Sequence, residues 1–252
     1  MSHPRTFRIN SHIHCVMRRS YFTCSYLVDT ENAGLIAIDA GMKSTGSDMF
    51  HALKELGRSP RDITAILLTH WHNDHASGAA ELAAASGAQV YYHSIESPYF
   101  TRERAASGFR SALSRVIPET GPLVLLHGLL ANAPDRAVHA TRHVVGGDSL
   151  PGDFLVLDTP GHTVGHVSYY HHPTRTLFAG DALAVINQRL RFMARPVTEN
   201  LAAARASIIH CLDRPIDFVC PGHREPLTQN ASLECTRLLT LARSNAPWPL
   251  FG

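Results

Sequence analysis

The chain has 252 residues, of which 44% are apolar and 17% charged, and 23 basic against 21 acidic side chains leave a formal net charge of +2. This length and balance fit one α/β domain spanning residues 1–252, and the small charge indicates no attraction to nucleic acid or to an acidic membrane surface. We find no apolar run near the roughly 18 residues that span a bilayer and no secretory signal at the start, so we expect a cytoplasmic protein.

The first third of the chain predicts strands and one helix before the first chemical motif. Apolar runs predict paired strands over 22–28 and 35–38, and residues 47–56 predict a helix that Gly57 ends. The apolar run 63–69 predicts a buried strand, because it is short and follows turn residues. What comes next is therefore the loop at the carboxyl end of that strand.

That loop carries four potential metal ligands within six residues: His70, His72, Asp74 and His75. In sheet proteins, binding groups collect on the loops at the carboxyl ends of strands. Three imidazoles and a carboxylate packed this closely would be costly to bury without a partner. A divalent cation supplies that partner, since both group types are good zinc ligands. The chain holds 17 histidines, so a surface histidine patch is the alternative for this cluster alone.

Three later strand-like runs each lead to one more ligand-type side chain. The runs are 154–158, 176–179 and 218–220, and the side chains that follow them are His162, Asp181 and His223. Glycine stands beside each of the three, which lets the backbone turn sharply and approach a bound ion. Four independent strand–loop–ligand units therefore predict a metal site.

The remaining predicted elements are three helices and one strand. They are a helix over 79–85, a strand over 89–92, a helix over 200–212 capped by Thr198, and a helix from about 231 to 243 capped by Asn230. Together with the earlier elements they support an α/β fold.

One segment exceeds the needs of a minimal core. Residues 97–135 are rich in apolar residues broken by prolines, which favours short helices and loops. Such insertions are often lids or binding loops, and a homodimer contact or packing on the domain surface are the alternatives. The hypothesis is that Phe100, Phe109 and residues 123–130 line an apolar pocket for a small-molecule substrate.

Together, these motifs resemble the metallo-β-lactamase superfamily. The matching residues, in the family's order, are His70-x-His72-x-Asp74-His75, then His162, Asp181 and His223. The resemblance runs from about Tyr26 to Pro226, most of the chain, and the combined motif is specific. It implies an αββα four-layer sandwich with two metal ions between the sheets at one edge.

The resemblance also implies how the ligands divide. It assigns His70, His72 and His162 to the first metal, Asp74, His75 and His223 to the second, and Asp181 to both as a bridge. Zinc is the first candidate for the two divalent ions, with iron or manganese as alternatives. Asp39, in a segment that also matches the family, is expected to orient a ligand histidine.

The expected reaction is hydrolysis. Two ions close together lower the pKa of a bridging water and hold a hydroxide that attacks a carbonyl or phosphoryl centre. Asp74 and Asp181 are the predicted catalytic carboxylates, with Asp74 taking up or delivering a proton. A small ester, lactone or thioester is favoured as the substrate, because the insertion at 97–135 is apolar rather than basic.

Other functions stay open: an iron-dependent persulfide dioxygenase-like oxidoreductase, a phosphodiesterase or nuclease of the same fold, and a non-catalytic metal-binding scaffold. Departures from known branches bear on the choice. Asp181 argues against a true β-lactamase, where this bridging acid is generally absent. Residues 182–222 contain no tyrosine, unlike the lactonases, and the tail after His223 is shorter than that of glyoxalase II-like thioesterases.

Four further side chains are weaker candidates. For His166, Cys220, Arg189 and Arg191 an ordinary structural or solvated role is favoured. The alternatives are lining the site for His166, ligation for Cys220, and contact with a substrate carboxylate for the two arginines, which we place in a loop after Asp181.

Overall fold

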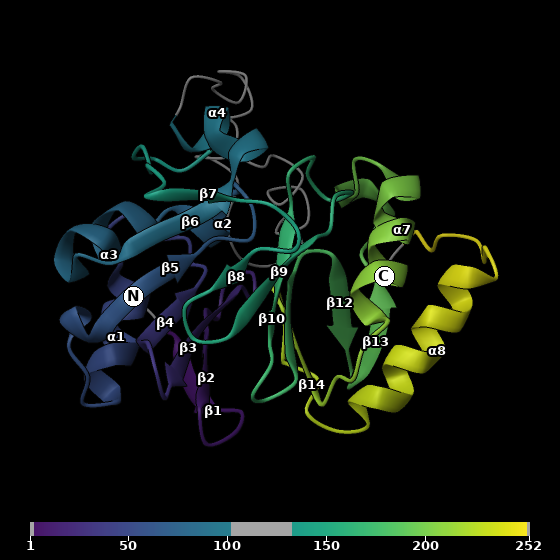
Figure 1. Ribbon diagram of the computed structural model, residues 1–252, viewed down its shortest axis with the longest axis horizontal. Coiled ribbons are helices and arrows are strands. Elements are labelled where there is room, and N and C mark those ends of the chain that lie inside the picture. Colours follow the sequence, from purple (N-terminus) through teal and green to yellow (C-terminus); the bar gives the residue numbers. More distant parts are fainter. Residues whose placement is uncertain (1–2, 102–132, 251–252) are drawn as a thin grey trace.

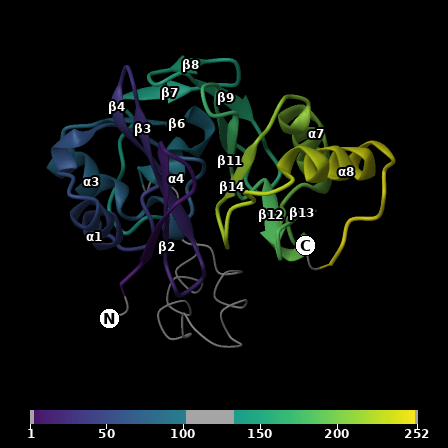
Figure 2. The same cartoon turned by 90° about the horizontal axis from the view of Figure 1, so that it is seen from below.

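Two β-sheets form the centre of the computed structural model, which describes residues 3–101 and 133–250 (Figure 1). The first sheet has seven strands in the order β1-β2-β3-β4-β5-β6-β7, and the second has five in the order β14-β11-β10-β9-β8. Helices lie on the outer faces of both sheets, so the layers follow the order helix, sheet, sheet, helix (Figure 2). The predicted αββα sandwich is confirmed.

The strands follow one another in chain order through the two sheets, with β14 added last. The first sheet contains β1 Arg5–Arg8, β2 Ile13–Met17, β3 Cys24–Thr30, β4 Gly34–Ile38, β5 Ile63–Leu67, β6 Gln89–His93 and β7 Arg142–Val144. The second contains β8 Ser149–Leu150, β9 Phe154–Asp158, β10 Val167–His171, β11 Thr176–Gly180 and β14 Phe218–Pro221. A separate hairpin consists of β12 Leu183–Ile186 and β13 Arg189–Phe192.

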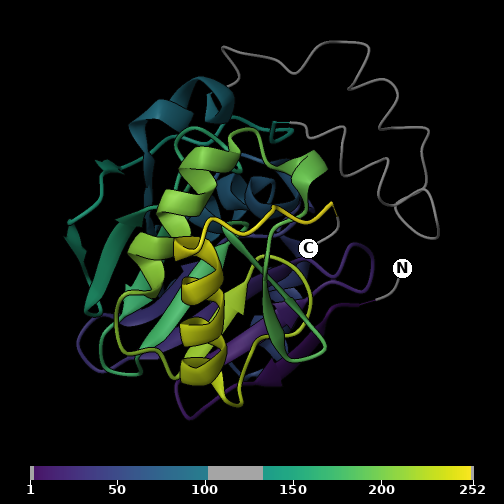
Figure 3. The ribbon, with the colours of Figure 1, turned by 90° about the vertical axis from the view of Figure 1, so that its right-hand side faces the viewer.

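Helices cover the outside of each sheet. In the first half of the chain they are α1 Ser47–Glu55, α2 Asn73–Ala76, α3 Ala79–Ser86 and α4 Ser97–Phe100. In the second half they are α7 Leu201–Leu212 and α8 Ala231–Arg243, which lie in front of the second sheet in Figure 3. The short 3-10 helices within the described residues are η1 Pro60–Asp62, η2 Ser94–Glu96 and η3 Arg195–Val197.

Three apolar clusters hold these layers together. In β4, Leu35 and Ala37 pack with α1 and α3, while Ile36 and Ile38 point into the space between the sheets. A third cluster joins the second sheet to α7 and α8. Full burial of one leucine or isoleucine side chain contributes about 1.5–3 kcal/mol. Both faces of β4 therefore stabilise the fold, as its continuous apolar sequence requires.

The directions of the strands decide where the predicted ligand loops lie. β4, β5, β6 and β7 are parallel in the first sheet, and β11 and β14 are parallel in the second. β9 points the same way as β11, because both are antiparallel to β10. Within each sheet, the loops that carry the predicted ligands therefore leave at a common edge.

The hairpin of β12 and β13 was not predicted. Arg189 and Arg191 lie on β13 rather than in a loop, and Nε of Arg189 is 3.7 Å from Oε1 of Glu234 on α8. The two turn residues, Asn187 and Gln188, have φ of +53° and +56°. A turn of this kind usually carries Asn-Gly, so the usual sequence signal is missing here.

The predicted cap of α7 is wrong, and the predicted cap of α8 is right in position only. The N-terminus of α7 is capped by Asn200, whose Oδ1 accepts a hydrogen bond from the backbone N–H of Ala203 at 3.0 Å, and not by Thr198. Asn230 precedes α8 as predicted, but its backbone is left-handed (φ +53°) and its side chain makes no capping hydrogen bond within the described chain.

Most of the apolar insertion at 97–135 cannot be compared with its prediction. Phe109 and residues 123–130 lie outside the described residues. Phe100 is fully buried and its ring stacks on Tyr92 with centroids 4.0 Å apart, so the prediction that it lines a substrate pocket is wrong. A lid or dimer contact at this segment stays a prediction. Among the described helices, none is both long enough and apolar enough to cross a membrane.

Candidate metal centre

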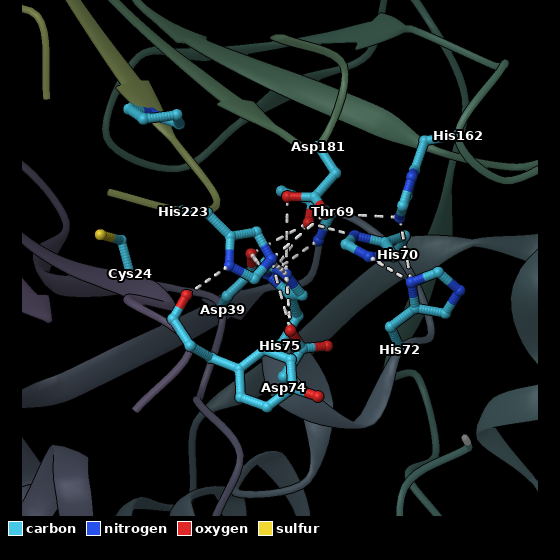
Figure 4. Close-up of polar contacts among 12 residues, drawn as sticks. Cys24, Asp39, Thr69, His70, His72, Asp74, His75, His162, Asp181 and His223 are labelled. Atoms are coloured by element: carbon cyan, nitrogen blue, oxygen red, sulfur yellow. Dashed lines mark hydrogen bonds and ion pairs between the residues drawn. The ribbon is translucent and has the colours of Figure 1, made fainter. Parts of the chain in front are cut away.

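The seven predicted ligands converge, although four separate parts of the chain carry them (Figure 4). The loop after β5 carries His70 and His72 and continues into α2 with Asp74 and His75, and the loops after β9, β11 and β14 carry His162, Asp181 and His223. Their ligand atoms form groups within 4.8 Å of one another. We name His70, His72 and His162 the three-histidine group, and Asp74, His75 and His223 the mixed group.

The three-histidine group is centred on His72. Its Nδ1 lies 3.1 Å from Nε2 of His70 and 3.0 Å from Nε2 of His162. Neutral imidazole has one donor and one acceptor nitrogen. Ring nitrogens this close therefore share protons or face a common cation.

The mixed group places a carboxylate among its two imidazoles. Nε2 of His223 lies 3.4 Å from Nε2 of His75 and 3.3 Å from Oδ2 of Asp74. The same oxygen of Asp74 is 3.7 Å from Nε2 of His75. This group therefore carries negative charge that the three-histidine group lacks.

Asp181 lies between the two groups. Its Oδ2 is 3.4 Å from Nε2 of His162 and 3.4 Å from Nε2 of His223, and its Oδ1 is 3.6 Å from Nε2 of His75. Burial raises its pKa, but the facing imidazoles of His223, His75 and His162 outweigh burial and hold it well below the usual value. Asp181 is therefore an ionised carboxylate that contacts both groups.

Backbone carbonyls orient two of the histidines from behind. Nδ1–H of His162 donates to the carbonyl of Val197 at 2.6 Å, and Nδ1–H of His223 donates to the carbonyl of Tyr21 at 3.1 Å. Each bond leaves the Nε2 lone pair facing the cluster. Tyr21 has a left-handed backbone (φ +67°), and the strand predicted from residue 22 begins only at Cys24.

Asp39 orients two further histidines, as the sequence predicted for one. Its Oδ2 accepts a hydrogen bond from Nδ1–H of His75 at 2.9 Å and another from the hydroxyl of Thr69 at 2.9 Å. Because that hydroxyl donates to Asp39, it accepts from Nδ1–H of His70 at 3.0 Å. Sequence reasoning missed Thr69, whose only signal is a hydroxyl directly before the first ligand.

Charge separates the two groups. Burial, followed by the neighbouring imidazoles, holds the pKa values of His70 and His72 well below the usual value for histidine. Burial also lowers the pKa of His162, although Asp181 opposes that effect. The three-histidine group is therefore neutral near pH 7 and offers free lone pairs.

The mixed group behaves in the opposite way when no ion is bound. Burial lowers the pKa of His75, but Asp74 and Asp181 outweigh it and raise the value to about 9. For His223 burial is outweighed by Asp181 and then Asp74, and the pKa rises to about 10. Protons therefore occupy these two imidazoles near pH 7 unless a cation replaces them.

Glycine next to two of the ligands is a packing requirement. A Cβ on Gly222 would lie 2.1 Å from Oδ1 of Asp181 and 2.6 Å from Cε1 of His75. Gly180 has a left-handed backbone (φ +50°), and a Cβ there would lie 2.7 Å from Nε2 of His166. The glycine-before-ligand pattern in the sequence thus reflects close approach of the backbone to the cluster.

The donor set fits divalent ions. A tetrahedral zinc ion with nitrogen ligands at about 2.1 Å keeps its ligand atoms about 3.4 Å apart, and the cluster distances range from 3.0 to 3.7 Å. Oδ1 of Asp181 is buried and accepts no hydrogen bond within the described residues. A buried carboxylate oxygen without a donor is an unusual cost, and a cation at this position removes it.

A family model decides the relationship. The model of the metallo-β-lactamase superfamily matches residues 21–223, more than half of the chain and all seven predicted ligands. The chain belongs to this superfamily. Both ligand groups lie within the matched residues.

Relatives of this superfamily member include proteins named as hydrolases. Probable metallo-hydrolase YflN of Bacillus subtilis is 29% identical over 160 residues, which cover 63% of this chain and 59% of that protein. Hydroxyacylglutathione hydrolase of Bdellovibrio bacteriovorus is 29% identical over 160 residues, covering 62% of this chain and 47% of that protein. The enzyme of the same name from Pseudomonas entomophila is 32% identical, covering 62% and 46%. The match thus spans about half the length of these relatives.

Solved structures of the superfamily share the fold. A metallo-β-lactamase family protein of Thermus thermophilus aligns with a TM-score of 0.65 at 20% identity, covering 94% of this chain and 81% of that one. Metallo-β-lactamase MIM-1 of Novosphingobium pentaromativorans aligns with a TM-score of 0.66 at 22% identity, covering 96% and 89%. At these identities the likeness extends to the fold alone.

His166 forms a hydrogen bond with the backbone of one predicted ligand, Asp181. Its Nε2 accepts a hydrogen bond from the backbone N–H of Asp181 at 3.0 Å, and its Nδ1–H donates to the hydroxyl of Thr159 at 2.8 Å. Burial, followed by the neighbouring imidazole of His162, lowers its pKa to about 3, so it stays neutral. His166 therefore orients Asp181 with both ring nitrogens engaged.

Cys220, weighed as a further ligand, belongs to none of the groups found among the described residues. Its side chain is fully buried in the apolar cluster between the sheets, and burial raises the pKa of its thiol well above the usual value. The ordinary buried thiol favoured from the sequence is the correct interpretation.

Proposed function

We propose that the three-histidine group and the mixed group each hold one divalent ion, with Asp181 shared between them. The observation that carries the proposal is the position of Asp181, whose Oδ2 lies 3.4 Å from a histidine of each group. Zinc is the first candidate, because imidazole nitrogens predominate among the donors. Iron and manganese are the alternatives.

The proposed reaction is hydrolysis of a carboxylic ester, lactone or thioester. Ions in the two groups would acidify a water molecule and polarise the carbonyl oxygen of the substrate. The carboxylate of Asp181 supports this chemistry by balancing charge between the groups. Asp74 is the more exposed of the two acids, at 12% of its side chain against 6% for Asp181. We therefore assign proton transfer to Asp74.

The substrate class is supported by the relatives and by the surface near the ligands. Hydroxyacylglutathione is a thioester, and proteins named for its hydrolysis are about 30% identical to this chain. Val164, which follows His162 closely, is 65% exposed, and Phe22, whose carbonyl accepts from the backbone N–H of Arg224, is 50% exposed. Apolar side chains flanking the ligand loops suit a small acyl group better than a phosphodiester backbone.

Metal analysis followed by a substrate panel tests the proposal. We expect about two zinc ions per chain and hydrolysis of members of a panel of ester, lactone and thioester substrates. One iron per chain with oxygen consumption would replace the proposal with dioxygenase chemistry. Cleavage of phosphodiesters alone would overturn the substrate class, and absence of bound metal in metal-supplemented protein would overturn the metal centre.

A further inference from the structure

Glu96 is a buried carboxylate that joins two loops of the metal centre. It ends η2 and is only 1% exposed. Its Oε2 accepts a hydrogen bond from the backbone N–H of Trp71 at 3.0 Å, and its Oε1 accepts one from the backbone N–H of Gly165 at 2.7 Å. Both oxygens of one side chain are therefore used to hold main-chain atoms.

The two amides that Glu96 binds lie on loops that leave different sheets. Trp71 stands between His70 and His72 on the loop after β5 of the first sheet, and Gly165 follows His162 on the loop after β9 of the second. The three-histidine group draws its nitrogens from these same two loops. A rigid carboxylate between them sets how far apart the two loops lie, and thereby the contact between His72 and His162.

Packing around Glu96 restricts this spacing further. A Cβ on Gly165 would lie 2.8 Å from Cγ and 2.9 Å from Oε1 of Glu96, so only glycine permits the observed approach. The ring of Trp71 stacks on Tyr99 of α4 with centroids 4.3 Å apart and an interplanar angle of 14°. The segment after β6 therefore holds the loop of His70 and His72 in two ways. Glu96 binds the backbone N–H of Trp71, and Tyr99 stacks on the Trp71 ring.

Burying this carboxylate has a cost that packing alone does not explain. Burial raises the pKa of Glu96 to about 7, although the N–H groups of Gly165 and Trp71 oppose the rise. An apolar residue would fill the same space without the desolvation penalty of a charge. Glutamate is suited to this position because its two oxygens can accept from two amides at once.

We propose that Glu96 is a positioning residue that sets the spacing of the two loops and thereby the affinity of the three-histidine group for its ion. This inference rests on the proposed function, since it takes the three-histidine group as a metal site. The hydrogen bonds of Glu96 go to the backbone of the loops that carry the ligands, so we infer that it acts through that backbone.

The test is Glu96→Gln, compared with the wild-type protein in stepwise Zn²⁺ and Co²⁺ titrations. Glutamine has one acceptor oxygen, so one of the two amides loses its partner and faces an NH₂ group. Removing a supporting partner of a metal ligand typically costs about 10- to 100-fold in affinity. We expect a loss of that size for the three-histidine ion, less than about a twofold change for the mixed-group ion, and an altered visible spectrum of the first Co²⁺ bound.

Glu234→Gln is the matched control. Glu234 is also buried (9% exposed) and also accepts a hydrogen bond from the backbone N–H of a distant residue, Leu190 at 3.0 Å, but it lies on α8. Both variants replace a carboxylate oxygen that accepts from a distant backbone amide, so both should lower the thermal unfolding temperature. Only Glu96→Gln should change metal affinity, and equal affinities in the two variants would overturn the proposal.

Amide hydrogen exchange in the metal-free protein gives a second readout that does not depend on the proposed function. The amides of Trp71 and Gly165 should be protected in the wild-type protein, and at least one should exchange faster in Glu96→Gln. Unchanged exchange, or equal weakening of both ions, would overturn the positioning role. If Glu96→Gln does not fold, Gly165→Ala displaces the same carboxylate, and it should show the same selective loss. Wild-type protein that binds no metal would instead overturn the proposed function.

Discussion

The three-histidine group and the mixed group place the same side chain, histidine, in two opposite electrostatic settings. In the first, buried imidazoles face one another and their pKa values fall. In the second, Asp74 and Asp181 face His75 and His223, whose pKa values rise to about 9 and about 10. The difference shows that the motif alone does not fix the charge of a histidine; its neighbours across the cluster do.

The contrast also explains why the acids lie where they do. Asp181 touches both groups, whereas Asp74 touches only the mixed group. Figure 4 shows Asp181 above His75 and His223 and beside His70, with Asp74 on the other side of the cluster. Two ions in this arrangement would meet unequal negative charge. Substitutions in the centre and changes of pH can therefore reveal whether the two groups behave as different sites.

The largest effect is expected from Asp181→Ala, because Asp181 is the carboxylate common to both groups. Loss of a supporting partner costs about 10- to 100-fold, and loss of a shared ligand should cost more, so we expect at least about a 1000-fold fall in hydrolysis and loss of both ions. Metal content and hydrolysis of the best panel substrate measure this. Asp213→Ala, an exposed acid at the end of α7, is the control. Full metal content in Asp181→Ala would show that the two groups are independent.

Single-histidine variants should separate the groups. His72→Ala should weaken the three-histidine ion by at least about 100-fold, and His223→Ala should do the same for the mixed-group ion, since each removes a proposed direct ligand. Stoichiometry near one ion per chain in each variant, by elemental analysis, is the expected result. His172→Ala, an exposed histidine after β10, should retain both ions. Loss of both ions from His72→Ala and from His223→Ala alike would contradict the division.

The pH dependence of metal binding should differ between the groups. His75 and His223 hold protons below their raised pKa values, so an ion entering the mixed group must displace them, and its affinity should rise about 10-fold or more per pH unit between about pH 6.5 and pH 8.5. The three-histidine group has lowered pKa values and should change little over this range. Proton release during a two-step titration, followed with an indicator dye, measures the difference. Equal proton release in the two steps would show that the two groups do not differ in protonation.

The smallest effect is expected from Asp39→Asn. The amide keeps one acceptor oxygen, so only part of the support for His75 and for Thr69 with His70 is lost. We expect about a 10-fold weaker affinity, at the low end for supporting residues, with the mixed group more affected because His75 bonds Asp39 directly. Competition with a chelator of known affinity measures the affinity of each of the two ions. A larger loss of affinity for the three-histidine ion would show that Asp39 supports the centre more through Thr69 and His70 than through His75.

Much of the centre is predictable because its signals are local. His70, His72, Asp74 and His75 follow one apolar strand, and each remaining ligand follows its own strand and glycine. The hairpin of β12 and β13 was missed because its local signal is absent: Asn187 and Gln188 adopt the turn without the glycine that usually marks it. Local rules succeed where the local signal is present and fail where it is absent.

By itself the sequence determined the seven ligand-type side chains and their order, since these depend on strand periodicity and on residues next to one another. The layered fold was implied by the resemblance to the superfamily. Only the tertiary structure decided which ring nitrogen faces the cluster, which histidines carry protons, and how Glu96 joins amides 25 and 69 residues away. Those properties depend on hydrogen bonds and charges between residues far apart in the chain. No pattern within a strand or loop encodes them, because they exist only once the two sheets have packed together.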